Sequence, residues 1–364
     1  MICYDSHVDT PSQLMRLRNL GIDNKYGHVD FPKLKRGGVD GSFFALYTPA
    51  DMAPDAATRY ALEMLSAVYD AVELLPEGEA AVTFLPSEAA QNKAQGVFSV
   101  FLGMENGAPI QESLSLLRCF YRLGVSYLTL THNGDNAIAD SAAEGRRWGG
   151  VSPFGRQVIR EMNSLGMMID LSHASDKTFW DALKLSQAPV VATHSCCRAL
   201  CGHRRNLTDE MLQALGEAGG YVGINFYPAF LSDDFARLPA EAALLEEADA
   251  VEAAFIACPG DRERVEAWRR MQDKLLELPR PGVKEVVDHI DHAVRLCGIE
   301  HVGIGSDFDG IQVPPQGLED VSCMGAVFEE MRRRGYSEEA VERIAGRNLM
   351  EVFKRVVKAS EIAD

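Results

Sequence analysis

The sequence has no long apolar run and no surplus of basic residues, and each shortage excludes a class of protein. No apolar stretch approaches the roughly 20 residues that a membrane-spanning helix needs. The formal net charge is −17 at pH 7. Nucleic-acid binding requires a concentrated basic surface, so this charge balance argues against such a partner. We therefore expect neither a membrane nor a nucleic acid to bind this chain.

Cysteine is also scarce, with eight residues in 364 and no C-x-x-C pair. This usage is typical of reduced thiols and not of a disulfide framework. The first nine residues, MICYDSHVD, have a strand-like pattern that is already polar by position 5, which leaves no room for a signal peptide. Together these features predict a cytoplasmic protein.

Short apolar runs alternate with helical patterns along the chain. The composition, 46% hydrophobic and 24% charged, is that of an ordinary globular protein. Eight runs have the length of buried parallel strands, and at least six end in His, Asp or Glu. These runs occupy residues 2–4, 39–47, 98–102, 126–131, 167–173, 189–195, 221–226 and 301–305.

This alternation predicts an α/β fold, a (β/α)8 TIM barrel whose site lies at the carboxyl ends of the strands. We expect a single domain over residues 1–364. Residues 231–281 are expected to form an acidic helical insertion, and residues 319–358 to form C-terminal helices that close the domain. A doubly wound open sheet is the alternative, but no glycine-rich phosphate loop follows any strand.

Five side chains at strand ends are candidates for one site. His173 and His194 end two successive strands, so both imidazoles point to one edge of the sheet. His7 and Asp9 lie two apart in an extended segment and therefore project from one face. Glu105 stands between glycines just after a buried strand, where a carboxylate is rare unless it is paired.

These donors are nitrogen and oxygen atoms without thiolates, which suits zinc, with manganese and cobalt as alternatives. Five ligands exceed what one catalytic zinc usually takes from protein. A carboxylate shared by two ions about 3.5–4 Å apart would divide them sensibly. Such a pair holds water as hydroxide near neutral pH, so the residues indicate metal-assisted hydrolysis.

Ordered motifs along nearly the whole chain resemble one known family. They include DSHVDTP and GMENG early in the chain, LGVSYLTLTHN, MMIDLSHAS and RRNLTDE in the middle, and GIGSDFDG and GRNLMEVF near the end. Motifs in this number and order are highly specific. By this resemblance the sequence is identified as a member of the membrane (renal) dipeptidase family, zinc metallopeptidases among the amidohydrolase-type barrels.

The resemblance implies a role for each candidate ligand. His7 and Asp9 match the ligands of one zinc, and His173 and His194 match those of the second. Glu105 matches the carboxylate that bridges the two ions. A hydroxide held between the ions is then expected to attack the carbonyl of a dipeptide.

Three further residues match positions that contact the substrate. His132 corresponds to the histidine that steadies the oxyanion. Arg205 corresponds to the arginine that binds the terminal carboxylate, and Asp307 to the acid that passes a proton to the leaving amine. Family members tolerate D-residues at the second position, so L-D dipeptides are among the expected substrates.

The sequence also departs from the family pattern at several positions. Asn106 replaces a glycine, Ser12 an aromatic residue, and Phe230 a tyrosine, which puts the substrate range in question. The insertion at 231–281 has no counterpart in the animal enzymes. It is expected either to cover the pocket or to form a contact in a homodimer.

Two other functions remain open on the sequence. The first is another amidohydrolase-type enzyme, acting on N-acyl amino acids, cyclic amides or lactones. Arg205 separates it from a dipeptidase, because a lactonase needs no anchor for a carboxylate. The second is a metal-binding scaffold without catalytic activity, which the intact set of candidate ligands disfavours.

Overall fold

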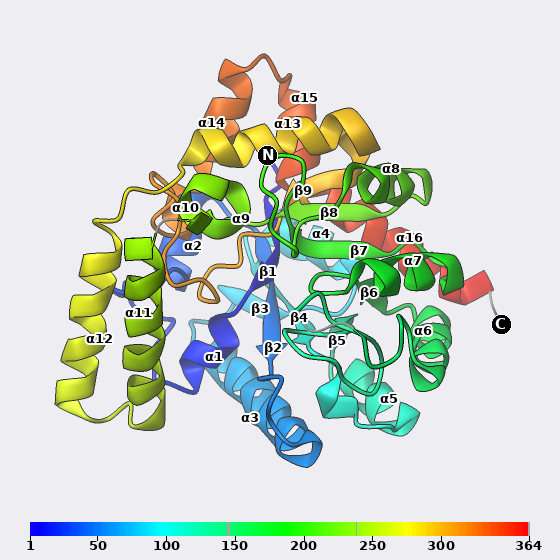
Figure 1. Ribbon diagram of the computed structural model, residues 1–364, viewed down its shortest axis with the longest axis horizontal. Helices are drawn as coiled ribbons and strands as arrows, with labels where there is room; N and C mark the ends of the chain where they lie inside the picture. The colour runs from blue at the N-terminus through cyan, green and yellow to red at the C-terminus, as the bar shows by residue number, and fades with distance from the viewer. Residues whose placement is uncertain (144–145, 238, 363–364) are drawn as a thin grey trace.

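The computed structural model describes residues 1–143, 146–237 and 239–362. Nine parallel strands in this part of the chain form one sheet, in the order β2-β1-β9-β8-β7-β6-β5-β4-β3. Because β2 also pairs with β4, eight strands close into a barrel that helices surround (Figure 1). The predicted (β/α)8 barrel is confirmed. The strands are β1 (Tyr4–Val8), β2 (Gly41–Tyr47), β3 (Ala80–Val82), β4 (Phe98–Glu105), β5 (Val125–Thr129), β6 (Met168–Asp170), β7 (Val191–Ser195), β8 (Tyr221–Ile224) and β9 (Val302–Ile304).

The ninth strand, β3, was not predicted. It has only three residues, all half-buried, which is too short for a recognisable pattern. It pairs with β4 over Phe98–Val100, whereas β5 pairs with β4 from Leu102 onward. β3 therefore fills the part of that edge which β5 leaves open, and the barrel itself keeps eight strands.

Two strand boundaries differ from the prediction in a way that matters for the site. β1 covers Tyr4–Val8 instead of residues 2–4, and β4 continues to Glu105 instead of ending at residue 102. Both extensions contain buried polar residues, which the search for apolar runs excluded. His7 and Glu105 are consequently strand residues with a backbone fixed by the sheet.

Helices surround the barrel (Figure 1). Ser152 and Thr208 begin two of them, since each hydroxyl accepts a hydrogen bond from the backbone N–H three residues on. The helices are α1 (Thr10–Leu14), α2 (Phe31–Gly37), α3 (Pro54–Glu73), α4 (Pro86–Gln95), α5 (Leu114–Arg122), α6 (Pro153–Leu165), α7 (Asp176–Leu185), α8 (Asp209–Glu217), α9 (Pro228–Leu231), α10 (Asp233–Arg237), α11 (Pro239–Ala257), α12 (Arg262–Leu275), α13 (Val283–Cys297), α14 (Gly325–Arg333), α15 (Glu338–Glu342) and α16 (Asn348–Ile362).

The C-terminal helix α16 seals one end of the barrel. Its Phe353 packs against Phe43 and Phe101, which belong to β2 and β4. Tyr127 and Tyr221 from β5 and β8 join the same buried cluster. This layer of aromatic rings fills the barrel interior, so a site is left only at the opposite, carboxyl ends of the strands.

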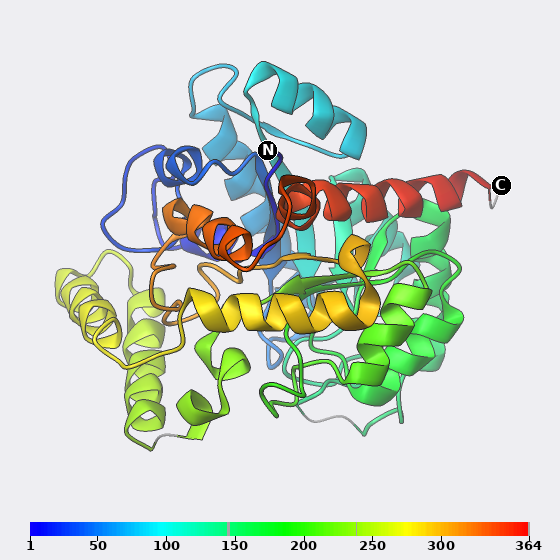
Figure 2. The same cartoon turned by 90° about the horizontal axis from the view of Figure 1, so that it is seen from above.

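The insertion predicted at 231–281 is helical and contains α10, α11 and α12. Figures 1 and 2 both show α11 and α12 as an antiparallel pair beside the barrel, which we call the α11–α12 hairpin. Its apolar contacts form a small cluster of their own with Phe235 and Val313. None of the helices in the described residues is long and apolar enough to span a membrane.

Candidate metal centre

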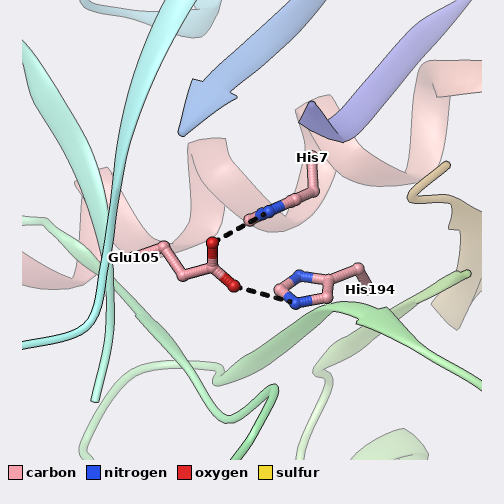
Figure 3. Close-up of side chains that lie close together, drawn as sticks. All are labelled: His7, Glu105 and His194. Carbon is pink, nitrogen blue, oxygen red and sulfur yellow. Dashed lines mark ion pairs between the residues drawn. The ribbon is translucent and has the colours of Figure 1, made fainter. Parts of the chain in front are cut away.

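Glu105 lies at the centre of a group of buried nitrogen and oxygen donors. One carboxylate oxygen, Oε2, is 3.6 Å from His7 Nε2. The other, Oε1, is 3.3 Å from His194 Nε2 and 3.0 Å from His173 Nε2. Figure 3 shows His7 and His194 side by side, each reaching a different oxygen of this carboxylate from a different strand. Asp9 Oδ2 completes the group at 3.4 Å from His7 Nε2.

Several of these donors have no hydrogen-bond partner within the described part of the chain. They are His7 Nε2, His194 Nε2 and Asp9 Oδ1, and all three atoms are buried. Buried polar atoms in folded proteins are almost always satisfied. Three overlapping sets drawn from these residues, two of which also include His132 or Asp307, place one donor atom each within 4.8 Å of one another. The residues therefore fit a bound cation.

The outer nitrogen of each imidazole has a partner that fixes the ring. His7 Nδ1 lies 2.8 Å from the Tyr127 hydroxyl, and His173 Nδ1 lies 3.1 Å from Asn133 Oδ1. His194 Nδ1 lies 2.9 Å from Thr193 Oγ1. All three rings consequently turn Nε2 toward Glu105, which is the arrangement that metal-ligating histidines adopt.

Burial and charge set the protonation of the centre. Burial opposes the charge on Glu105, but His7 together with the neighbouring His173 and His194 outweighs it and holds its pKa well below the ordinary value. Burial lowers the pKa of His173 strongly, with Arg205 adding to the effect, and burial also lowers the pKa of His194. Neutral imidazoles beside an ionised carboxylate are the states that bind a metal.

The pKa values of Asp9 and His7 are raised, in contrast to those of Glu105, His173 and His194. Burial, together with the neighbouring charge of Glu105, raises the pKa of Asp9 well above its ordinary value. Burial disfavours the charged form of His7, but Tyr127 and the two carboxylates outweigh it and raise its pKa. The centre thus gathers negative charge that a cation would neutralise.

The three residues matched to substrate contacts surround this centre. Arg205 is buried, its Nη2 donates to His194 O at 3.3 Å, and burial lowers its pKa to about 10. Its guanidinium lies 5.3 Å from the centroid of the Phe230 ring. The ring of His132 lies between those of Tyr47 and His173, with centroids 4.8 and 4.3 Å away.

Asp307 is held beside the centre from two sides. Its Oδ2 accepts a hydrogen bond from Asn225 Nδ2 at 2.8 Å, and its Oδ1 lies 4.0 Å from His7 Nε2. The backbone of Asp307 has φ of 63°, and that of His173 has φ of 66°. Such left-handed conformations are uncommon for non-glycine residues and are concentrated at functional sites.

A cavity of about 520 Å³ opens above the centre. Arg205, His132 and Asp307 line its inner part, whereas α11 contributes Asp249 and Glu252 to its outer wall. The insertion therefore borders the pocket, which agrees with the first of its two expected placements. The second, a homodimer contact, stays a prediction.

The residues at the departures from the family pattern lie close to this cavity. Asn106 has φ of 82°, a conformation that glycine and asparagine adopt most readily, so asparagine can replace glycine there. Its side chain donates to Thr48 O and accepts from Asn136 Nδ2. Ser12 and Phe230 both line the cavity, so these two replacements do border the substrate space.

The structure brings together all eight site residues predicted from the sequence. It adds residues that the sequence reasoning missed, above all Tyr127, Asn133, Asp170, Thr193 and Asn225, which hold four of those eight, His7, His173, His194 and Asp307, in place. Asp170 could have been found, because a carboxylate within the apolar run MMIDLSH is the same signal that singled out Glu105.

Comparisons with known proteins point to one family. The family model described as membrane dipeptidase (peptidase family M19) matches residues 1–363. An uncharacterized dipeptidase of Schizosaccharomyces pombe is 32% identical over 371 residues, which cover 96% of this chain and 80% of that protein.

Two solved structures share the whole fold. The probable dipeptidase PvdM from Pseudomonas aeruginosa is 28% identical with a TM-score of 0.83, covering 99% of this chain and 96% of that one. A metallopeptidase from Rhodobacter sphaeroides, solved with a phosphinate mimic of the dipeptide L-Ala-D-Ala, is 28% identical with a TM-score of 0.80. That match covers 98% of this chain and 99% of the other.

Proposed function

The chain belongs to the membrane dipeptidase family of metallopeptidases (peptidase family M19), and on that premise we propose that it hydrolyses dipeptides with two zinc ions. The observation that carries this proposal is the convergence of buried donors on the two oxygens of Glu105. The match of the family model over residues 1–363 supports treating the chain as one hydrolase domain. Manganese and cobalt suit the same nitrogen and oxygen donors and are the alternatives to zinc.

The two oxygens of Glu105 divide the ligands into two sets. His7 and Asp9 lie on the Oε2 side, and His173 and His194 lie on the Oε1 side. Each set would hold one ion, and Glu105 would supply a carboxylate oxygen to both sets. When bound, the ions supply a water of lowered pKa and polarise the carbonyl of the scissile bond.

Asp307 and His132 handle the proton and the developing charge. Asp307 takes the proton that the attacking water releases and returns it to the departing nitrogen, while Asn225 holds its carboxylate in place. Burial lowers the pKa of His132 to about 4, so the ring stays neutral and can donate a hydrogen bond to the oxyanion. Its Nδ1 has no hydrogen-bond partner among the described residues, so this nitrogen is available to contact the oxyanion.

Arg205 limits the substrate to dipeptides. Its buried guanidinium can pair with a free carboxylate one residue past the scissile bond, which longer peptides do not offer at that position. The phosphinate mimic of L-Ala-D-Ala bound to the Rhodobacter sphaeroides relative supports L-D dipeptides as substrates here.

The test is a hydrolysis panel of L-L, L-D and D-L dipeptides with the metal content of the protein measured in parallel. Matched substrates with an amidated carboxyl end, N-acyl amino acids and a lactone serve as controls. We expect cleavage of dipeptides with a free carboxylate and loss of that activity on chelation. Equal cleavage of the amidated substrates would contradict the role of Arg205, and faster turnover of N-acyl amino acids or lactones would contradict the proposed substrate class.

A further inference from the structure

Asp170 is a buried carboxylate that the proposed reaction does not use. It lies at the end of β6, fully buried, and both of its oxygens accept two hydrogen bonds. The backbone N–H groups of Ser172 and Thr193 donate to Oδ1 at 3.1 and 2.8 Å. The hydroxyls of Thr129 and Thr193 donate to Oδ2 at 2.6 and 2.7 Å.

The direction of these hydrogen bonds determines which neighbour receives the hydroxyl proton of Thr193. A hydroxyl has one proton to donate, and a carboxylate has none. The Thr193 proton therefore goes to Asp170, and Thr193 Oγ1 can only accept from its remaining neighbours. One of those neighbours is His194 Nδ1, 2.9 Å away.

The same reasoning extends one step further, to the metal centre. Because Thr193 Oγ1 accepts, the proton of the neutral His194 ring must sit on Nδ1. Nε2 then carries a lone pair, and it is this atom that lies 3.3 Å from Glu105 Oε1 without a hydrogen-bond partner among the described residues. A lone pair at Nε2 is what a metal ligand requires.

We propose that Asp170 is a positioning residue which, through Thr193, sets the tautomer of His194 and so presents Nε2 to the metal. This assignment builds on the metal centre proposed above. The other two rings lack such a charged anchor: His7 Nδ1 faces the Tyr127 hydroxyl, and His173 Nδ1 faces the side-chain oxygen of Asn133. His194 is thus the ligand whose tautomer a buried carboxylate dictates.

The competing explanation is that Asp170 only ties three strands together. Its hydroxyl partners Thr129 and Thr193 belong to β5 and β7, on either side of β6. The two explanations separate at Thr129, because its hydroxyl donates to the same carboxylate oxygen but makes no hydrogen bond to His194 in the described part of the chain. Thr129→Val is therefore the matched control for Thr193→Val.

The experiment compares Thr193→Val, Thr193→Ser, Thr129→Val and Asp170→Asn with the unmodified protein. Zinc affinity is measured by competition with a chromophoric chelator, and thermal unfolding of each variant is recorded. The tautomer of His194 is observed in the metal-free protein by ¹⁵N NMR of labelled histidine, assigned from the signal that His194→Gln removes.

We expect Thr193→Val to lower zinc affinity by about 10–100-fold, the usual loss when the outer partner of a metal-bound histidine is removed. Thr193→Ser, which keeps the hydroxyl, should keep the zinc affinity of the unmodified protein. Thr129→Val should change that zinc affinity by no more than about threefold. In Asp170→Asn the amide can donate to Thr193, whose hydroxyl then donates to His194 Nδ1 and moves the ring proton to Nε2. The NMR signal should change accordingly, with a loss of zinc affinity.

Two outcomes would overturn this assignment. The first is an Nε2–H tautomer of His194 in the unmodified, metal-free protein. The second is an equal loss of zinc affinity in Thr129→Val and Thr193→Val, which would leave only the role of tying strands together. If Asp170→Asn does not fold, the comparison of Thr193→Val with Thr193→Ser decides. Failure of the proposed dipeptidase activity would look different, since zinc would bind as expected while no dipeptide is cleaved.

Discussion

The pocket is bordered by two regions that are stabilised in different ways. On the barrel rim, which consists of the strand ends that carry the candidate ligands, the side chains are buried and each ring has a second partner behind it. On the α11–α12 hairpin, Asp249 is exposed and Ile256 is 42% exposed. The hairpin is joined to the barrel side of the pocket by the Arg16–Glu252 ion pair and by a hydrogen bond from Gln312 to Asp249.

This difference indicates that the barrel rim and the hairpin have different roles. The Arg16–Glu252 pair is half-buried, and an ion pair that solvent can reach contributes about 0–1 kcal/mol, whereas a fully buried polar group that loses its partner costs far more. The rim is therefore rigid and suited to chemistry, and the hairpin is suited to tuning access and substrate range. Local opening should begin in the hairpin, whose apolar cluster is small and separate from the main core.

The strongest test of the comparison makes the same substitution in both regions. Glu105→Gln should remove the shared ligand and lower kcat/KM by at least about 10³-fold, or roughly 4 kcal/mol. Glu252→Gln, on the hairpin wall of the same pocket, should leave kcat/KM within about fivefold, because its half-buried ion pair with Arg16 is reached by solvent and binds no candidate metal ligand. Steady-state kinetics on one dipeptide checks both variants, and losses of similar size would break the comparison.

A second pair of variants removes an arginine from each region. Arg205→Met should lower kcat/KM for dipeptides by about 10²–10³-fold, roughly 3–4 kcal/mol, because the substrate carboxylate would then be buried without a partner. Arg16→Met should have a small effect, since its guanidinium pairs with Glu252 at the outer wall. The measurement is kcat/KM for a dipeptide and for its amide. A variant at Arg205 that retains the preference for the free acid would refute the anchor.

Acid should destabilise the barrel through buried histidines, of which the hairpin has none. Burial lowers the pKa of His28 to about 4, and its Nδ1 accepts a hydrogen bond from the Asp309 backbone N–H at 2.9 Å. Between pH 6.5, the ordinary value, and pH 4 the unfolded chain binds a proton that folded His28 does not. The free energy of unfolding should therefore fall as the pH falls through this window.

His28→Asn isolates that effect, because the asparagine can keep an acceptor near the Asp309 N–H. It should reduce the pH dependence of the unfolding free energy by up to about 1.4 kcal/mol per pH unit between these limits. Urea unfolding of the metal-stripped protein at several pH values measures the slope. An unchanged slope would show that His28 does not titrate as its burial implies.

The smallest effect concerns the attachment of the hairpin. Breaking the Arg16–Glu252 pair should speed hydrogen exchange of the α11 amides by no more than about fivefold, the equivalent of roughly 1 kcal/mol. Exchange in β1 and β7 should not change. Hydrogen–deuterium exchange followed by mass spectrometry on Glu252→Gln gives the answer, and faster exchange in the strands would indicate one cooperative unit.

The sequence carried enough information to predict the barrel and five of the site residues, because histidines and carboxylates end several of its short apolar runs. The other three, His132, Arg205 and Asp307, followed only from the resemblance of its motifs to a known family. The sequence did not reveal β3, which is only three residues long. It also misplaced β1, whose polar residues Asp5 and His7 are buried within the strand. The contacts that hold the ligand rings could not be predicted, for a different reason. Tyr127 lies 120 residues from His7 along the chain, and no local sequence pattern joins the two.

The central claim is that two ions held around Glu105 carry the reaction, and one measurement tests it most directly. Zinc bound per chain is determined together with dipeptide hydrolysis while a chelator removes the metal and added zinc restores it. The account predicts two zinc ions per chain at full activity, with activity falling and recovering as they leave and return. Full hydrolysis by protein stripped of every divalent ion would contradict it.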